Sequence, residues 1–208
     1  MKAQAKKTRP PIIGLTGGIG MGKSTAAAIL REMGLPVYHA DGAVHDLLAK
    51  GGKAVKPVAR LFPETLRRGA IDRKRLGHIV FNHPGKLRKL EKILHPLVRQ
   101  AEHEFLQKAR QRKARAAILE IPLLFETGAD KRCDYVICVA APKAVQAKRV
   151  LHRPGMTAKK LKAIRARQWP DTKKRKHADF TVDTGGSLAA TRRRLRAVLG
   201  SVLGDDHA

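Results

Sequence analysis

One motif constrains the fold of this chain more than any other feature: residues 17–24 read GGIGMGKS. They match the pattern G-x-x-x-x-G-K-[ST], in which glycines let backbone N–H groups turn toward phosphates. A short apolar run precedes the motif at 12–16, and helically spaced apolar residues follow it up to Gly34. In such a loop Lys23 supplies charge to the β/γ oxygens and Ser24 offers a hydroxyl to Mg²⁺. The sequence therefore predicts a binding site for a nucleoside triphosphate between a strand and a helix.

Four further short apolar segments predict strands, at 36–40, 116–121, 135–139 and 180–183. Helical patterns lie between them, and residues 41–111 are helical and polar, with apolar residues at three- and four-residue spacing. Alternating strands and helices call for a parallel sheet covered by helices on both faces. We therefore expect an α/β fold with five parallel strands.

The charge is the unusual part of the composition, since 44 Lys and Arg stand against 17 Asp and Glu, a formal net charge of +27. Such a chain repels itself unless anions bind it, which predicts phosphate-rich ligands or surroundings. By default the basic runs 173–176 and 192–194 are solvated helix faces, and residues 1–11 form a frayed basic arm. No apolar run reaches the ~18 residues of a bilayer helix. The two cysteines, Cys133 and Cys138, lack metal-site spacing and fit a reducing cytoplasm.

Asp41 is the second candidate site residue, because it follows the strand predicted at 36–40. Ligands of open parallel sheets gather outside the carboxyl ends of the strands, so Asp41 is expected to face the same crevice as the phosphate loop. A plainer alternative is that Asp41 caps a helix at 42–50. The residues alone leave both readings open.

Several collinear motifs resemble the dephospho-CoA kinase family. The most specific are LTGGIG at 15–20 with GKST at 22–25, and PLLFE at 122–126. The likeness continues through the following matches, which cover about residues 12–190: Ala40-Asp41 with His45, Asp72-Arg73 with Leu76 and Phe81, Leu94-His95-Pro96-Leu97, Gln146 with Arg149 and Arg153, Gln168, Ala178-Asp179 and the loop near Asp183.

The resemblance implies a P-loop NTPase fold, with a three-layer α/β/α core, a helical substrate-binding region and a small lid. The expected domain spans 12–203, and its parts are a core (12–41, 114–145 and 178–203), a helical acceptor-binding region (42–113) and a lid (about 146–177), with 204–208 as a tail. The implied reaction moves the γ-phosphoryl group of ATP, with Mg²⁺, to the ribose 3′-hydroxyl of dephospho-CoA and yields coenzyme A and ADP.

The resemblance also implies roles for individual residues. Asp41 becomes the carboxylate that accepts or orients the 3′-hydroxyl proton, and Lys23, Arg149 and Arg153 join it as catalytic residues. The two arginines are spaced one helical turn apart, so we expect them on one helix face, converging on a phosphate. The ATP contacts are Gly17, Gly18, Gly20, Met21, Gly22, Lys23, Ser24, Thr25 and Thr184, with Ser24 toward Mg²⁺. The acceptor contacts are Asp41, His45, His95, Pro122, Leu123, Leu124, Phe125 and Glu126.

Plainer alternatives stand beside these roles: a helix-terminal His95 with a local partner, core packing for 123–125, and exposed lid arginines without a ligand. Two positions depart from the family pattern, since His39 stands where an aspartate is frequent and Thr184 where an asparagine near the adenine is common. That puts the details of Mg²⁺ ligation and of the adenine site in question.

Two rival functions remain. A nucleic-acid-binding protein fits the charge, but aromatic residues are only 4% of the chain, which leaves few stacking platforms. A kinase of the same fold with another small acceptor is disfavoured by the PLLFE and HPL matches. We expect a cytoplasmic enzyme of small-molecule substrates, with monomer favoured and with neither specific nucleic acid nor membrane as a partner.

Overall fold

The computed structural model describes residues 9–81, 83–166 and 168–204. They divide into two compact units. The first consists of the chain up to Tyr38 together with Ala109 onward, and the second is His39–Lys108. The expected frayed arm and tail lie largely at 1–8 and 205–208, outside the described residues.

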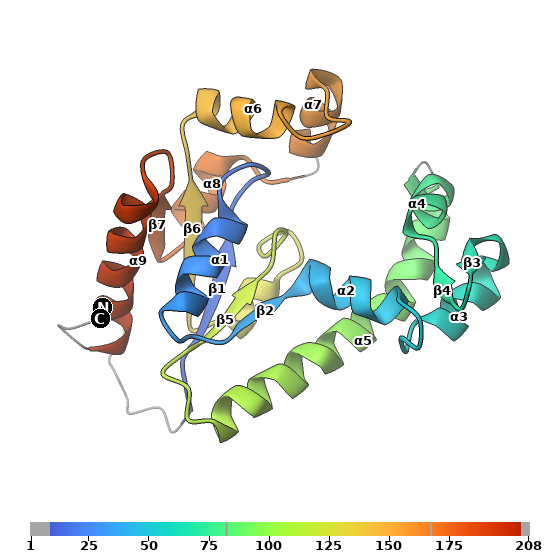
Figure 1. The fold of residues 1–208 in the computed structure, drawn as a ribbon, viewed down its shortest axis with the longest axis horizontal. Helices are drawn as coiled ribbons and strands as arrows, with labels where there is room; N and C mark the ends of the chain where they lie inside the picture. Colours follow the sequence, from blue (N-terminus) through green and yellow to red (C-terminus); the bar gives the residue numbers. More distant parts are fainter. Residues whose placement is uncertain (1–8, 82, 167, 205–208) are drawn as a thin grey trace. The chain divides into compact units, whose positions relative to one another are not determined.

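The first unit is built on a five-stranded sheet with the order β2-β5-β1-β6-β7 (Figure 1). Its strands are β1 (Ile12–Thr16), β2 (Val37–His39), β5 (Ala117–Glu120), β6 (Tyr135–Ala140) and β7 (Phe180–Asp183). β1 lies at the centre and pairs in parallel with β5 and with β6, whose far side pairs in parallel with β7. The predicted five-stranded parallel sheet is thus confirmed, with strand boundaries close to those expected.

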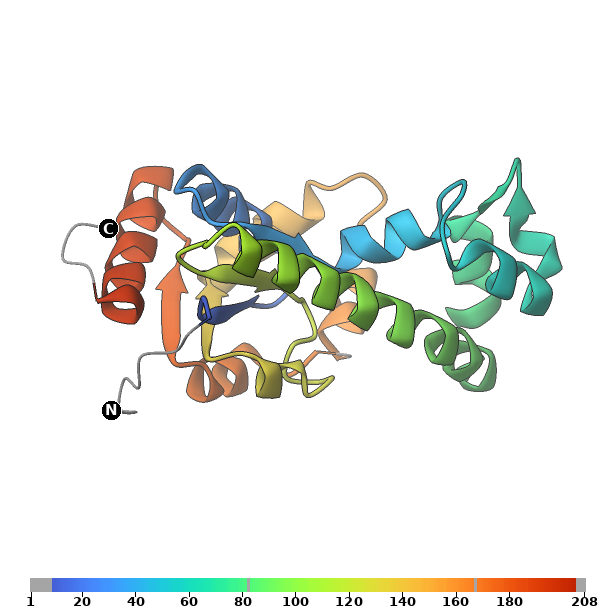
Figure 2. The same cartoon turned by 90° about the horizontal axis from the view of Figure 1, so that it is seen from below.

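Helices cover both faces of this sheet, as Figure 2 shows for α1 and α8. On one face, α1 (Lys23–Glu32) and α9 (Leu188–Leu203) pack on the strand side chains that point toward them. Their shared apolar core includes Ile13, Leu15, Ile29, Ile137, Val182, Leu195 and Leu199. The other face is covered by α8 (Asp171–His177) and by the segment that follows β5. There a Cβ on Gly14 would come 2.9 Å from Cys133 Sγ and 3.0 Å from Leu124 Cδ2, so a larger residue would require these two side chains to shift.

Three shorter elements complete the first unit. They are η2 (Ala129–Arg132), α6 (Lys143–Leu151) and α7 (Ala158–Ala166). Within the described part of the chain, no helix is both long and apolar enough to cross a bilayer.

The second unit is helical with a small hairpin. Its elements are α2 (Ala40–Leu48), α3 (Val55–Leu61), η1 (Pro63–Thr65), β3 (Leu66–Arg67), β4 (Ala70–Ile71), α4 (Arg73–Phe81) and α5 (Pro84–Gln111), the last of which runs on into the first unit. Its own apolar core includes Leu48, Val58, Phe62, Leu76 and Leu90. The helices were expected, but the hairpin was not.

Two expectations about charged segments each failed at one residue. Arg9 is not frayed, because its guanidinium donates to both carboxylate oxygens of Asp134, at 2.8 and 3.0 Å. Lys174, in the basic run 173–176, is 0% exposed rather than solvated. In both cases the partner is more than 40 residues away in sequence, so the pattern of neighbouring residues carried no sign of it.

Candidate active site

The phosphate loop has the backbone that its glycines allow. Gly17 has φ +148° and Gly22 has φ +81°, in the region that side chains disfavour. Added Cβ atoms would also collide there, at 2.5 Å from the Val139 carbonyl oxygen and at 2.9 Å from Thr184 Oγ1. The loop therefore needs glycine at both positions for its conformation and for its packing.

Helix α1 begins at Lys23, immediately after the loop, and its first turn holds no acidic residue. Its first amide groups and its dipole thus present positive potential to an anion. Lys23 Nζ donates to the carbonyl oxygens of Gly17, at 2.9 Å, and of Gly18, at 3.3 Å. Its ammonium group therefore lies against the loop itself. Ser24 and Thr25 are exposed in the first turn.

Side chains from three other segments hold the loop in place. Gln146 Nε2 donates to the Ile19 carbonyl at 2.8 Å, and the Ile19 amide donates to Gln168 Oε1 at 3.1 Å. The Thr184 hydroxyl donates to the Met21 carbonyl at 2.9 Å. The resemblance included both glutamines but gave them no role, and the structure shows that one binds the amide and the other the carbonyl of Ile19.

Thr184, which contacts the loop through its bond to Met21, is only 4% exposed. Arg149 donates to its carbonyl oxygen at 2.7 Å and to its hydroxyl at 3.3 Å. The side chain that was expected near the adenine is thus engaged with Met21 and Arg149. Its contact with ATP stays a prediction.

Arg149 and Arg153 do not share a helix face, contrary to expectation. Helix α6 ends at Leu151, and Arg153 lies in the exposed turn beyond it. Gly155, at φ +72°, follows in the same turn. The spacing of one helical turn predicted a common face only if the helix continued to Arg153, and it ends at Leu151.

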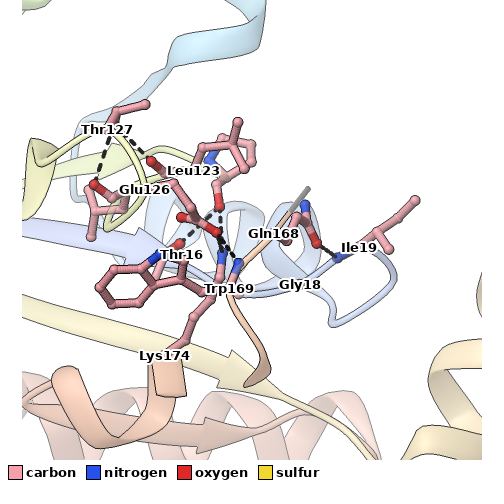
Figure 3. A network of polar contacts seen from close by, with 12 residues as sticks. Thr16, Gly18, Ile19, Leu123, Glu126, Thr127, Gln168, Trp169 and Lys174 are labelled. Atoms are coloured by element: carbon pink, nitrogen blue, oxygen red, sulfur yellow. Dashed lines mark hydrogen bonds and ion pairs between the residues drawn. The ribbon is translucent and has the colours of Figure 1, made fainter. Parts of the chain in front are cut away.

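The segment 122–126 after β5 carries a polar network (Figure 3). The Pro122 carbonyl accepts from Thr16 Oγ1 at 3.2 Å and from Lys174 Nζ at 3.0 Å. Glu126 Oε1 lies 2.9 Å from Lys174 Nζ and accepts from the Trp169 amide at 2.7 Å. Sequence reasoning missed Lys174 and Trp169, because no motif marked either residue.

The apolar residues of this segment face different surroundings. Leu124 is 0% exposed and contacts Gly14, which is the core packing left open as an alternative. Phe125 is 7% exposed, and its ring stacks on Trp169 with centroids 5.7 Å apart. Leu123 is 38% exposed. Of the three side chains, that of Leu123 is the one available to a ligand in this structure.

Three predicted site residues belong to the second unit. Asp41 is an exposed residue of the first turn of α2, whose N-cap is His39, so it is not the helix cap of the alternative reading. His45 Nδ1 lies 2.6 Å from Arg73 Nη1, and His95 is exposed on α5. Because these residues and the phosphate loop lie in different units, their convergence on one crevice stays a prediction.

The described residues contain no cluster of three or more His, Cys, Asp and Glu side chains fit to hold a metal ion. Mg²⁺ seldom needs one, since it keeps several waters and binds through one or two protein oxygens plus substrate phosphates. The exposed Ser24 hydroxyl at the start of α1 fits that pattern.

Comparison with known proteins gives a consistent picture. The family model for dephospho-CoA kinase matches residues 11–190. A curated dephospho-CoA kinase from Brucella melitensis is 48% identical over 93% of this chain and 96% of its own length. One from Paramagnetospirillum magneticum is 56% identical over 79% of this chain and 77% of its own length.

Two solved structures are also similar to this chain over most of its length. A dephospho-CoA kinase from Campylobacter jejuni superposes with a TM-score of 0.71 at 30% identity, covering 93% of this chain and 97% of that one. A crystal structure from Thermus thermophilus gives a TM-score of 0.82 at 39% identity, covering 93% and 98%. A shikimate kinase from Acinetobacter baumannii, at 18% identity and a TM-score of 0.53, shares the fold alone.

Proposed function

The chain belongs to the dephospho-CoA kinase family, and on this premise we propose which of its residues perform the reaction. The enzyme phosphorylates dephospho-CoA to coenzyme A at the expense of ATP. The observation that carries this conclusion is the complete phosphate loop at the start of α1, within a chain that matches the family along residues 11–190.

ATP binds with its phosphates against the loop. The backbone N–H groups of the loop and of the first turn of α1 donate to the phosphate oxygens, and Lys23 exchanges the carbonyls of Gly17 and Gly18 for the β/γ oxygens. These N–H groups belong to Gly18, Gly20, Met21, Gly22, Lys23, Ser24 and Thr25, and that of Met21 would exchange the Gly18 carbonyl, to which it donates at 3.2 Å, for a phosphate oxygen. Gly17 lets the chain turn beneath Val139, and Thr184 fixes the Met21 carbonyl.

Mg²⁺ accompanies the nucleotide, and the Ser24 hydroxyl is the protein group that would hold it. When bound, the ion neutralises charge on the β- and γ-phosphate oxygens. His39, the N-cap of α2, stands where relatives often carry an aspartate, so this chain offers one carboxylate fewer there.

Asp41 orients the acceptor. The 3′-hydroxyl oxygen forms a bond to the γ-phosphorus while the bond from that phosphorus to the β,γ-bridging oxygen breaks, and ADP leaves. In a loose transition state the attacking oxygen stays weakly acidic until late, so an ordinary carboxylate suffices to aim it and to take its proton. Asp41 is exposed and ready for this role. The acceptor contacts come from His45 and His95, and from the segment of Pro122, Leu123, Leu124, Phe125 and Glu126.

In the lid region at about 146–177, Gln146, Gln168 and Lys174 keep their contacts with the phosphate loop and the segment after β5. The turn after α6 closes over the phosphates, where Arg153 joins Arg149 and water is excluded. Residues 42–113 receive the acceptor, and the remaining described segments form the core. The enzyme acts as a cytoplasmic monomer on these two small molecules, without a specific nucleic acid.

The test is formation of coenzyme A from dephospho-CoA and ATP, with adenosine and gluconate as competing acceptors. Lys23→Ala is expected to fold normally and to lose at least about a hundredfold in turnover, because a cation facing developing phosphoryl charge is worth ~3 kcal/mol or more. Lys131→Ala removes the same charge from an exposed position in η2 and should leave turnover unchanged. A folded Lys23→Ala protein with wild-type turnover would refute the assignment.

A further inference from the structure

Among the described residues of the first unit, Lys174 is the most deeply buried charged one, with 0% exposure in a run whose other members are exposed. Burying an ammonium group is costly unless a partner compensates its charge. The partner here is Glu126, whose side chain is 13% exposed and whose Oε1 lies 2.9 Å from Lys174 Nζ. Such a pair stabilises a fold only weakly in comparison with apolar packing, so its location is the informative feature.

The pair is connected to the phosphate loop through other residues by two routes, both of which appear in Figure 3. In the first route, Lys174 Nζ donates to the Pro122 carbonyl at 3.0 Å, which also accepts from the hydroxyl of Thr16 at 3.2 Å. Thr16 is the last residue of β1 and immediately precedes Gly17. The Lys174 ammonium group and the residue just before the loop, Thr16, therefore donate to the same acceptor, the Pro122 carbonyl.

The second route runs through Glu126. Its Oε1 accepts from the Trp169 amide at 2.7 Å, and the neighbouring Gln168 accepts from the Ile19 amide at 3.1 Å. The Trp169 ring is stacked on Phe125, with an interplanar angle of 9°. Residues 168 and 169 are thus fixed between the segment after β5 and the phosphate loop.

We propose that Lys174 is a positioning residue for the phosphate loop. Its charge keeps the buried Glu126 carboxylate in place, and the carboxylate holds the Trp169 amide. Gln168 thereby holds the amide of Ile19, whose carbonyl accepts from Gln146. Groups that are ordered before a ligand arrives do not have to be ordered by it, so this arrangement strengthens ATP binding. The inference rests on the proposed function, because it concerns the same loop.

The decisive variant is Lys174→Met, which keeps the length of the side chain and removes its charge. It is expected to weaken binding of a non-hydrolysable ATP analogue roughly tenfold, the equivalent of losing one hydrogen bond in the ordered loop. Isothermal titration measures this affinity on folded protein. Lys176→Met, which alters an exposed lysine of the same helix, is the matched control and should bind as the wild type does.

The double variant Lys174→Met/Glu126→Gln separates positioning from bulk stability. It removes both charges, while the new amide oxygen can still accept from the Trp169 amide. We expect ATP affinity to return to within about threefold of the wild type, since the loss in the single variant comes from an unpaired buried carboxylate. Trp169 is the only tryptophan of the chain, so its emission reports the same recovery without reference to activity.

Wild-type ATP affinity in folded Lys174→Met, or failure of the double variant to regain affinity, would overturn the proposal. Should Lys174→Met not fold, Gln168→Ala takes its place, because it removes the last link and leaves the buried pair intact. It is expected to lower ATP affinity severalfold, and an unchanged or higher affinity refutes the role. A failure of the proposed function looks different, since the wild-type protein itself would then make no coenzyme A.

Discussion

At the scale of single residues, Asp41 carries the strongest prediction about the chemistry. Asp41→Asn is expected to keep the fold and ATP binding but to lose at least about a hundredfold in turnover, because the amide cannot take the hydroxyl proton. Removing an acidic residue from the first turn of α2 should lower the free energy of unfolding by less than ~1 kcal/mol. Turnover and thermal melting measure the two effects separately.

Asp46→Asn is the control for this experiment, as Asp46 is an exposed carboxylate further along the same helix. It should leave turnover unchanged. The structure sharpens the comparison because α2 has His39 as its N-cap, so a capping role no longer competes as an explanation. Asp41→Asn turnover within about threefold of the wild type would remove Asp41 from the mechanism.

Cys138 gives a prediction about pH. Burial beneath α8 raises the pKa of its thiol from the ordinary 9.0 to about 11. The folded protein therefore holds this proton between pH 9 and 11 while the unfolded chain releases it, so the stability contributed by the protonated thiol is lost as pH rises through that window. Alkylation of the native protein at pH 8, read by mass spectrometry, should leave Cys138 unmodified. Rapid labelling of Cys138 in the folded state would contradict the burial and the raised pKa of this thiol.

At the scale of elements, sequence patterns predicted those with strong local signals. The strands were recognised because apolar runs such as 12–16 and 135–139 end in turn residues. The hairpin of β3 and β4 escaped because each strand has two residues and its turn is Arg68-Gly69, rather than the Asn-Gly or Asp-Gly pairs that mark such turns. Both turn residues have positive φ, 47° and 81°.

Candidate site residues divide in a similar way. The phosphate loop could be predicted because its chemistry is local, with glycines, Lys23 and Ser24 consecutive in sequence. Lys174 could not, and Gln168 was matched in the resemblance without a role, because their partners Glu126 and Ile19 lie far away along the chain. The end of α6 was missed for a different reason, since Pro154 marks the boundary only within a few residues.

This early end of α6 predicts different behaviour for the two lid arginines. Arg153→Ala is expected to lower kcat more than it raises the KM for dephospho-CoA, with little change in melting temperature, because Arg153 is exposed. Arg149→Ala should lower kcat and also the melting temperature, because it breaks two bonds to Thr184. Steady-state kinetics and thermal melts of both variants test the difference. A rise in acceptor KM alone would make Arg153 a uniform binding residue.

At the scale of the whole molecule, the net charge of +27 exceeds what the reaction requires. We expect it to form a solvated surface, so the kinetic constants should change by less than about threefold between low salt and about 0.15 M, apart from screening of the encounter with anionic substrates. Kinetics at both ionic strengths, with and without an unrelated oligonucleotide, test this. Activity that depends on added nucleic acid would favour the nucleic-acid-binding function over a kinase of small molecules.

The position of β1 has a consequence for how the protein is made. β1 leaves the ribosome before its two sheet neighbours, β5 and β6, which follow about a hundred residues later. The second unit, His39–Lys108, has its own apolar core and is synthesised in one piece between them. During translation the second unit can therefore form its apolar core first. The phosphate loop can reach its final structure only after β5 and β6 have been synthesised. The loop of the nucleotide site is thus synthesised before the second unit, and the strands beside it are synthesised after that unit.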